Sequence, residues 1–124
     1  METITTKFDN FGKLSISENR RYLMEGDKPF FWLGDTAWLM LLKLDEDEIY
    51  TYLRNRKGKG YNVIQTVLIQ SPQDVESSLA PGRKDVTKSE YWNFVDQILD
   101  MAEQMGLYIG LLPDWGSLVK ANIL

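Results

Sequence analysis

The sequence contains no cysteine and no histidine among its 124 residues. Without cysteine, a disulfide framework, a thiol nucleophile and a thiolate metal site are all excluded. Without histidine, the chain lacks the Ser-His-Asp and Cys-His catalytic arrangements, the HExxH zinc motif and any imidazole general base. We therefore expect no metal site and assign no cofactor. If the chain takes part in proton chemistry near neutral pH, carboxylates must carry it.

Excess positive charge and long apolar runs are also missing. The formal net charge is −4, from 14 basic and 18 acidic residues, so the chain has no basic field of the kind that binds nucleic acid. No run approaches the roughly 18 apolar residues of a membrane span, and the N-terminus lacks the basic and apolar regions of a signal peptide. We expect neither nucleic acid nor a membrane as a partner. Localisation stays open between a cytoplasmic protein and a processed secreted one.

The sequence is rich in apolar residues. Of its residues 44% are hydrophobic and 12% aromatic, which excludes a disordered chain. Near the N-terminus, residues 14–17 and 21–24 flank the polar triplet Glu18-Asn19-Arg20. This pattern predicts an antiparallel hairpin with a tight turn, and residues 25–29 predict a second turn after it.

The apolar run Phe30-Phe31-Trp32-Leu33 is followed at once by Gly34-Asp35-Thr36. A short run with apolar residues on both faces predicts a buried strand over 30–33, with Asp35 and Thr36 at its C-terminal tip. In parallel α/β folds, ligands bind at that tip. Residues 37–42 are again apolar and form either a helical turn or a loop packed over the strand end.

A helix and a second strand follow. Asp45 at the N-cap and Glu48 at the capping-box position predict the start of the helix, and Gly58 or Gly60 predicts its end. Residues 61–70 are rich in β-branched residues and predict a buried parallel strand.

The second half of the chain repeats this design. Residues 71–86 predict a long loop, Thr87 to Glu90 a second capping box, Gly106 a helix end, and residues 107–112 a third strand. Between them, seven apolar residues recur at helical spacing and predict one buried helix face: Tyr91, Phe94, Val95, Ile98, Leu99, Ala102 and Met105.

The predicted order is hairpin, strand, helix, strand, helix, strand, which is an α/β pattern with right-handed crossovers. A doubly wound sheet would satisfy it, but no GxGxxG or GxxxxGK[ST] loop follows any strand. A (β/α)8 barrel also satisfies it and needs about 250 residues. The strand and helix pattern alone leaves both folds open, and together with the family resemblance described next it predicts a partial (β/α)8 TIM barrel in which residues 1–124 form one partial domain. Its hairpin spans 12–28, and its first three β/α units span 29–124.

Several separated blocks in the right order resemble the N-terminal part of the apiosidase-like glycoside hydrolases. The blocks are Gly12 to Ser17, Arg21-Tyr22-Leu23, Lys28 to Trp38, Tyr61 to Gln65, Tyr91 to Asp96 and Gly106 to Gly116. The resemblance runs from about residue 14 to residue 115. It implies a (β/α)8 catalytic domain, often followed by a small β domain labelled putative collagen-binding.

The resemblance further implies hydrolysis of glycosidic bonds in a complex polysaccharide by a pair of carboxylates. The acid/base of the family is expected within a Gly-Gly-Asp type segment on a later strand, and this sequence contains no such segment. We therefore assign no catalytic residue within these 124 residues and expect the isolated chain to be an inactive fragment. The alternative is a non-catalytic saccharide-binding or assembly module.

Six residues are candidate saccharide-binding groups: Asp35, Thr36, Trp38, Gln65, Asp114 and Trp115. Carboxylates make strong hydrogen bonds to hydroxyl donors, and an indole offers a flat apolar surface to a sugar ring. Each also has a simpler explanation, because the two Asp residues can cap or form turns, Gln65 can bond a neighbouring backbone group, and most tryptophans pack in cores. Uncovered strand edges further predict self-association.

Overall fold

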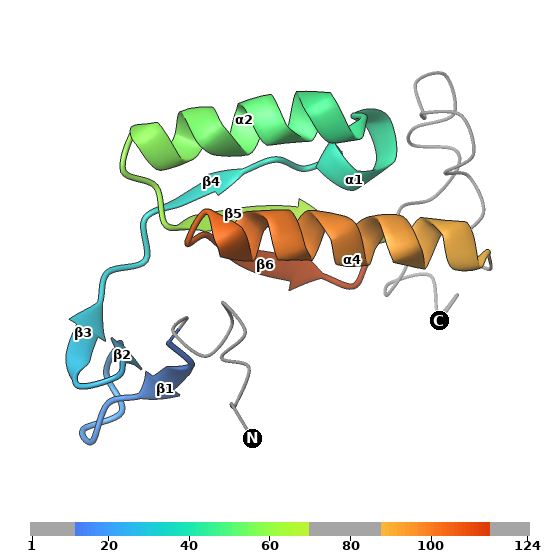
Figure 1. Ribbon diagram of the computed structural model, residues 1–124. Helices are drawn as coiled ribbons and strands as arrows, with labels where there is room; N and C mark the ends of the chain where they lie inside the picture. Colours follow the sequence, from blue (N-terminus) through green and yellow to red (C-terminus); the bar gives the residue numbers. More distant parts are fainter. Residues whose placement is uncertain (1–11, 70–87, 115–124) are drawn as a thin grey trace, which may run out of the picture. The chain divides into compact units, whose positions relative to one another are not determined.

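The computed structural model describes residues 12–69 and 88–114 of the chain (Figure 1). The chain is of mixed α/β type and divides into two compact units, residues 1–33 and 34–124. Each unit carries a small sheet within the described residues. The two units are considered separately below.

The first unit contains an antiparallel sheet of three short strands, β1 (Leu14–Ile16), β2 (Leu23–Glu25) and β3 (Lys28–Phe30), in the order β1-β2-β3. The register pairs β1 with β2 around the turn that the sequence predicts, so the hairpin prediction is confirmed. The second turn is also confirmed, because Gly26 adopts a φ of 61°, a left-handed conformation that glycine reaches without steric cost.

The strand predicted over residues 30–33 is wrong in position. Phe30 ends β3 of the hairpin sheet, and Phe31, Trp32 and Leu33 are 77%, 44% and 40% exposed. The first strand of the second unit is instead β4 (Gly34–Thr36). Gly and Asp have low intrinsic preference for strands, so the local sequence gives no signal for β4. This strand forms because it pairs with β5. Asp35 therefore lies in the middle of a strand and not beyond its end.

The second unit is built on a parallel sheet of β4, β5 (Val63–Val67) and β6 (Tyr108–Leu112), in the order β4-β5-β6. The predicted second and third strands are confirmed, each within its predicted range. The register places Asp35 beside Ile64 and Thr36 beside Gln65. Parallel pairing requires a crossover connection between neighbouring strands; α2 lies in the connection from β4 to β5, and α4 lies in the connection from β5 to β6.

Three helices accompany this sheet in the described residues: α1 (Met40–Lys43), α2 (Glu46–Gly58) and α4 (Ser89–Gln104). The capping box of α2 is confirmed, since Asp45 Oδ1 accepts from Glu48 N at 2.8 Å and Glu48 Oε2 accepts from Asp45 N at 2.9 Å. The capping box predicted at residues 87–90 is not the start of α4. Lys88 occupies the N-cap position without a side-chain cap bond, and Thr87 lies outside the described residues.

Helices α2 and α4 pack against one another and against the sheet (Figure 1). The predicted apolar face of α4 is confirmed, because its buried residues are Tyr91, Val95, Ile98 and Ala102. Gly106 ends the helix with a φ of 73°. The core between these helices and the sheet also contains Ile49, Leu53 and Ile64.

The helix layer defines the two faces of the parallel sheet. Ile64 belongs to the core that the helices cover, so its register partner Asp35 points to the same face. Thr36 and Gln65 follow them by one residue and therefore point to the opposite face. Among the described residues, no helix is long and apolar enough to cross a membrane.

Candidate functional site

Asp35 is bonded to helix α2. Its Oδ2 atom accepts a hydrogen bond from Tyr52 Oη at 2.8 Å and forms an ion pair with Arg56 Nε. Its Oδ1 atom accepts from the backbone N–H of Thr36 at 3.0 Å. The Arg56 guanidinium also lies over the ring of Tyr52, 4.7 Å from the ring centroid, where a cation is attracted to the π face.

These contacts fix the charge states of the cluster formed by Asp35, Tyr52 and Arg56. Hydrogen bonds from Tyr52 and from Arg56 hold the pKa of Asp35 below its usual value. Burial, and then its bond to Asp35, raise the pKa of Tyr52 to about 12. Asp35 therefore stays a carboxylate and Tyr52 a neutral donor around pH 7. A cluster with these pKa shifts is poorly suited to move protons near neutral pH.

This cluster leads to a prediction for pH-dependent stability. Because the pKa of Asp35 is lower in the folded than in the unfolded chain, its contribution is complete above pH 3.8 and is lost as the pH falls further. Asp35→Asn should be less stable than the native sequence at about pH 7, and the difference should shrink towards about pH 3. Urea unfolding followed by tryptophan fluorescence measures both values.

The matched control for this prediction is Asp96→Asn, which changes an exposed carboxylate on α4. This variant should follow the native sequence at both pH values. A constant difference between Asp35→Asn and the native sequence across the pH range would contradict the prediction.

Thr36 and Gln65 lie together on the sheet face opposite the helices. Thr36 Oγ1 donates to Gln65 Oε1 at 3.5 Å, and the Ala37 backbone N–H donates to the Gln65 carbonyl at 2.8 Å. Gly110 of β6 is the register partner of Gln65 and leaves room beside it. A hydroxyl and a carboxamide side by side can both donate to and accept from a sugar hydroxyl.

The other predicted residues follow the C-terminal ends of the strands. Trp38 lies between β4 and α1, and its carbonyl accepts from Val67 N at 3.3 Å. Asp114 is half-buried two residues beyond β6, and Trp115 lies outside the described residues. The structure thus brings Thr36 and Gln65 into direct contact, whereas Asp35 points to the other face.

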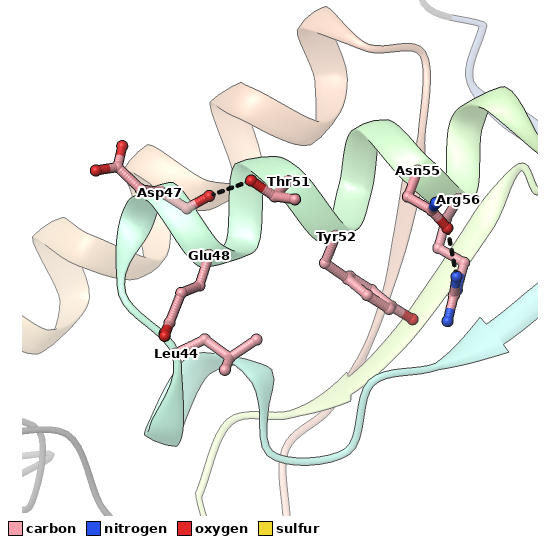
Figure 2. A pocket seen from close by; sticks show the side chains of 7 residues that line it. All are labelled: Leu44, Asp47, Glu48, Thr51, Tyr52, Asn55 and Arg56. Carbon is pink, nitrogen blue, oxygen red and sulfur yellow. Dashed lines mark hydrogen bonds between the residues drawn. The ribbon is translucent and has the colours of Figure 1, made fainter.

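Two of the pockets that α2 side chains line share Leu44 and Tyr52. The larger, of about 570 Å³, is lined by Leu44, Asp47, Glu48, Thr51, Tyr52, Asn55 and Arg56 (Figure 2). The second, of about 250 Å³, is mainly apolar and is lined by Trp38, Leu44 and Tyr52 among others. Trp38 therefore contributes to a pocket that also includes α2 side chains.

Tyr52 and Arg56 were not predicted as part of a site. Their spacing of four residues places them on one helix face, where an arginine among apolar neighbours needs an anionic partner. This spacing is the signal that could have pointed to a carboxylate. Only the fold identifies that carboxylate as Asp35, which lies 21 residues before Arg56.

A family model for the apiosidase-like catalytic domain matches residues 17–123. The chain belongs to this family. The resemblance stated from the sequence blocks is thereby confirmed. No curated protein matches the sequence, so the remaining similarity comes from solved structures.

Two of the solved structures that are similar to this apiosidase-like chain are glycoside hydrolases by title. One, titled a glycoside hydrolase, is 38% identical with a TM-score of 0.70, and the match covers 89% of this chain and 27% of that chain. The other, titled a glycoside hydrolase family 5 protein from Bacteroides vulgatus, is 34% identical with a TM-score of 0.75. That match covers 100% of this chain and 29% of the Bacteroides chain. The apiosidase-like chain thus spans less than a third of either structure.

Proposed function

We propose that this chain is the N-terminal part of a (β/α)8 glycoside hydrolase. The observation that carries the proposal is the apiosidase-like match over residues 17–123. The parallel order β4-β5-β6 with helices on one face is the arrangement expected of three β/α units of a barrel. The strand edges left open at β4 and β6 within the described sheet are also expected to favour self-association.

In this proposal the chain forms part of the wall of a saccharide site. The face opposite the helices is the interior of a barrel, so Thr36 and Gln65 would point inward. Trp38 and Asp114 follow the C-terminal ends of β4 and β6, where the active sites of such barrels lie, and Trp115 is the next residue in the sequence after Asp114. Asp35 would not contact the saccharide. Its carboxylate is bonded to α2 and to the backbone N–H of Thr36, so it would help to hold Thr36 in position.

The bond-breaking carboxylates are assigned to other strands of the barrel. Glycoside hydrolysis needs two carboxyl groups on either side of the scissile bond, about 5 to 9.5 Å apart. Asp35 is already paired with Arg56 on the helix side of the sheet, so it is a poor member of such a pair. The chain would then bind part of a saccharide without cleaving it.

The test combines a turnover assay with a binding assay on the purified 124-residue chain. With a panel of p-nitrophenyl glycosides we expect no release of nitrophenol. Titration with plant cell-wall oligosaccharides should shift the amide resonances of Thr36 and Gln65 with weak affinity, on the order of millimolar, since only part of the site is present. Turnover by this chain would overturn the assignment of catalysis to other strands.

A matched pair of variants shows whether the oligosaccharide binds at Thr36 and Gln65 or changes the resonances without binding at a defined site. The double substitution Thr36→Ala and Gln65→Ala should abolish the shifts, whereas Thr51→Ala on α2 should preserve them. Micromolar binding by a monodisperse chain without turnover would instead favour the non-catalytic saccharide-binding module. Unchanged binding by the double variant would contradict the proposed wall residues.

A further inference from the structure

A basic segment occupies the C-terminal half of α2 and the turn after it. Residues 49–62 contain no aspartate or glutamate, although the formal net charge of the chain is −4. The segment carries four cations, which are Arg54, Arg56, Lys57 and Lys59. Arg56 is paired with Asp35, and Lys57 Nζ donates to the Gly106 carbonyl at 3.3 Å. Packing therefore accounts for two of the four charges.

The other two cations, Arg54 and Lys59, are exposed. Within residues 12–69 and 88–114, no hydrogen bond or ion pair engages either side chain. Cations stabilise the last turn of a helix through its dipole, but Arg54 lies before the last turn of α2, which ends at Gly58. The dipole therefore explains Lys59 better than Arg54. Both positive charges are available to a ligand.

Both side chains line one hollow on α2. This hollow has a volume of about 440 Å³ and is lined by Tyr50, Thr51, Arg54, Asn55, Gly58 and Lys59. These residues form two rows at a spacing of four, so they stand on neighbouring ridges of the helix. The row that begins at Tyr50 ends in open space, because Gly58 has no side chain and a Cβ there would meet nothing within 4 Å.

The hollow faces away from the core. The buried residues of α2 are Ile49 and Leu53. At about 100° per residue, Arg54 and Gly58 lie about 140° and 180° around the helix from Ile49. The hollow is therefore separate from the saccharide wall proposed above, which lies on the sheet face opposite the helices.

Thr51 and Asn55 bring hydrogen-bonding groups to this hollow. The Thr51 hydroxyl donates to the Asp47 carbonyl at 2.9 Å, which leaves its oxygen able to accept (Figure 2). Asn55 Oδ1 accepts from Arg56 at 2.6 Å, which leaves the amide nitrogen of Asn55 able to donate. A sugar hydroxyl both donates and accepts, so this pair suits it. The ring of Tyr50, which is 45% exposed, adds a flat apolar surface.

We propose that this hollow binds an acidic oligosaccharide, whose sugar carboxylates pair with Arg54 and Lys59. The ring of Tyr50 packs against a sugar face, and Thr51 and Asn55 bond sugar hydroxyls. The hollow extends about 12 Å along α2, at 1.5 Å per residue from the first lining residue to the eighth after it, so it holds more than one sugar unit.

The lining selects this ligand among other anions. Inorganic phosphate would use only the two cations, whereas the tyrosine ring and the hydroxyl-bonding pair have a use only with a saccharide. Because no described carboxylate lines the hollow, a uronic acid fits it better than a neutral sugar. The site would hold a stretch of acidic polysaccharide on the outside of the domain. The inference does not depend on the wall residues of the proposed function.

The test is a titration of the purified 124-residue chain with oligogalacturonate at low ionic strength, where exposed charges are least screened. The amide resonances of Arg54, Asn55 and Gly58 report binding. The fully methyl-esterified oligomer is the matched ligand, because it keeps the sugar rings and loses the negative charges. We expect saturable shifts with the acid form and an affinity about tenfold lower for the ester.

Three variants assign the contacts. The double substitution Arg54→Gln and Lys59→Gln removes both charges and should weaken binding of the acid form about tenfold. The matched control, Lys13→Gln with Arg21→Gln, removes two exposed cations that do not line the hollow, and its affinity should stay within about twofold of the native value. Tyr50→Ala should weaken binding of the acid and the ester alike, because it removes only stacking surface.

Each contrary outcome has a defined meaning. Equal weakening by the two double variants would overturn the hollow in favour of general attraction between charges. Equal affinity for the acid and the ester would overturn the pairing with Arg54 and Lys59. Phosphate that binds as tightly as oligogalacturonate, or a single-stranded oligonucleotide that binds more tightly, would overturn the saccharide as ligand. Loss of the shifts on α2 alone would leave the proposed wall at Thr36 and Gln65 standing.

Discussion

Leu53→Ala is expected to lower the free energy of unfolding of this chain by about 2 to 5 kcal/mol. Leu53 is fully buried on α2, in the core shared with α4 and the sheet. Truncation removes apolar contacts and leaves a cavity that the surrounding helices fill only in part. Urea unfolding followed by circular dichroism measures the change, which should shift the midpoint while the slope stays constant.

Arg54→Ala is the matched control for Leu53→Ala. The two residues are neighbours on α2 and both variants keep good helix formers, but Arg54 is exposed. The control should unfold within about 0.5 kcal/mol of the native chain. Equal effects of the two substitutions would contradict the packing of α2 against the core described above.

Tyr91→Phe is expected to lower the free energy of unfolding by about 0.5 to 1.5 kcal/mol, the net contribution of a typical intramolecular hydrogen bond. The Tyr91 hydroxyl donates to the Leu68 carbonyl just beyond β5, and the side chain is 1% exposed. The substitution keeps the ring and removes only the donor. It therefore measures how strongly α4 is held to the C-terminal end of β5.

Tyr50→Phe is the control, because it removes a tyrosine hydroxyl from an exposed site on α2, where Tyr50 is 45% exposed. Surface substitutions of this kind change stability by no more than about 0.5 kcal/mol. The comparison isolates the buried hydrogen bond from any general effect of replacing tyrosine. Identical midpoints for Tyr91→Phe and the native chain would show that the bond adds nothing to the stability of α4.

Patterns confined to a few neighbouring residues predicted much of the fold. Asp45 and Glu48 form the capping box of α2 because both partners lie within one helical turn. The apolar face of α4 follows from the spacing of Tyr91, Val95 and Ile98, which is independent of what covers that face. The hairpin likewise depends on its turn, and the family resemblance depends on the order of the blocks.

Strand β4 and the partners of Asp35 could not be predicted in this way. The apolar run 30–33 suggested a strand, yet the strand of the parallel sheet is Gly34–Thr36, which its pairing with β5 defines. That pairing joins residues 29 positions apart in the sequence, as in the bond between Thr36 and Gln65.

The sequence by itself therefore determined the alternation of strands and helices, the absence of thiol and imidazole chemistry, and the apiosidase-like family. Only the tertiary structure decided that Asp35 faces α2 and that Thr36 and Gln65 share the other face. The physical reason is the two-residue period of a strand, because a shift of one position sends a side chain to the opposite face. The position of β4 is set by pairing with a distant strand, which no local pattern encodes.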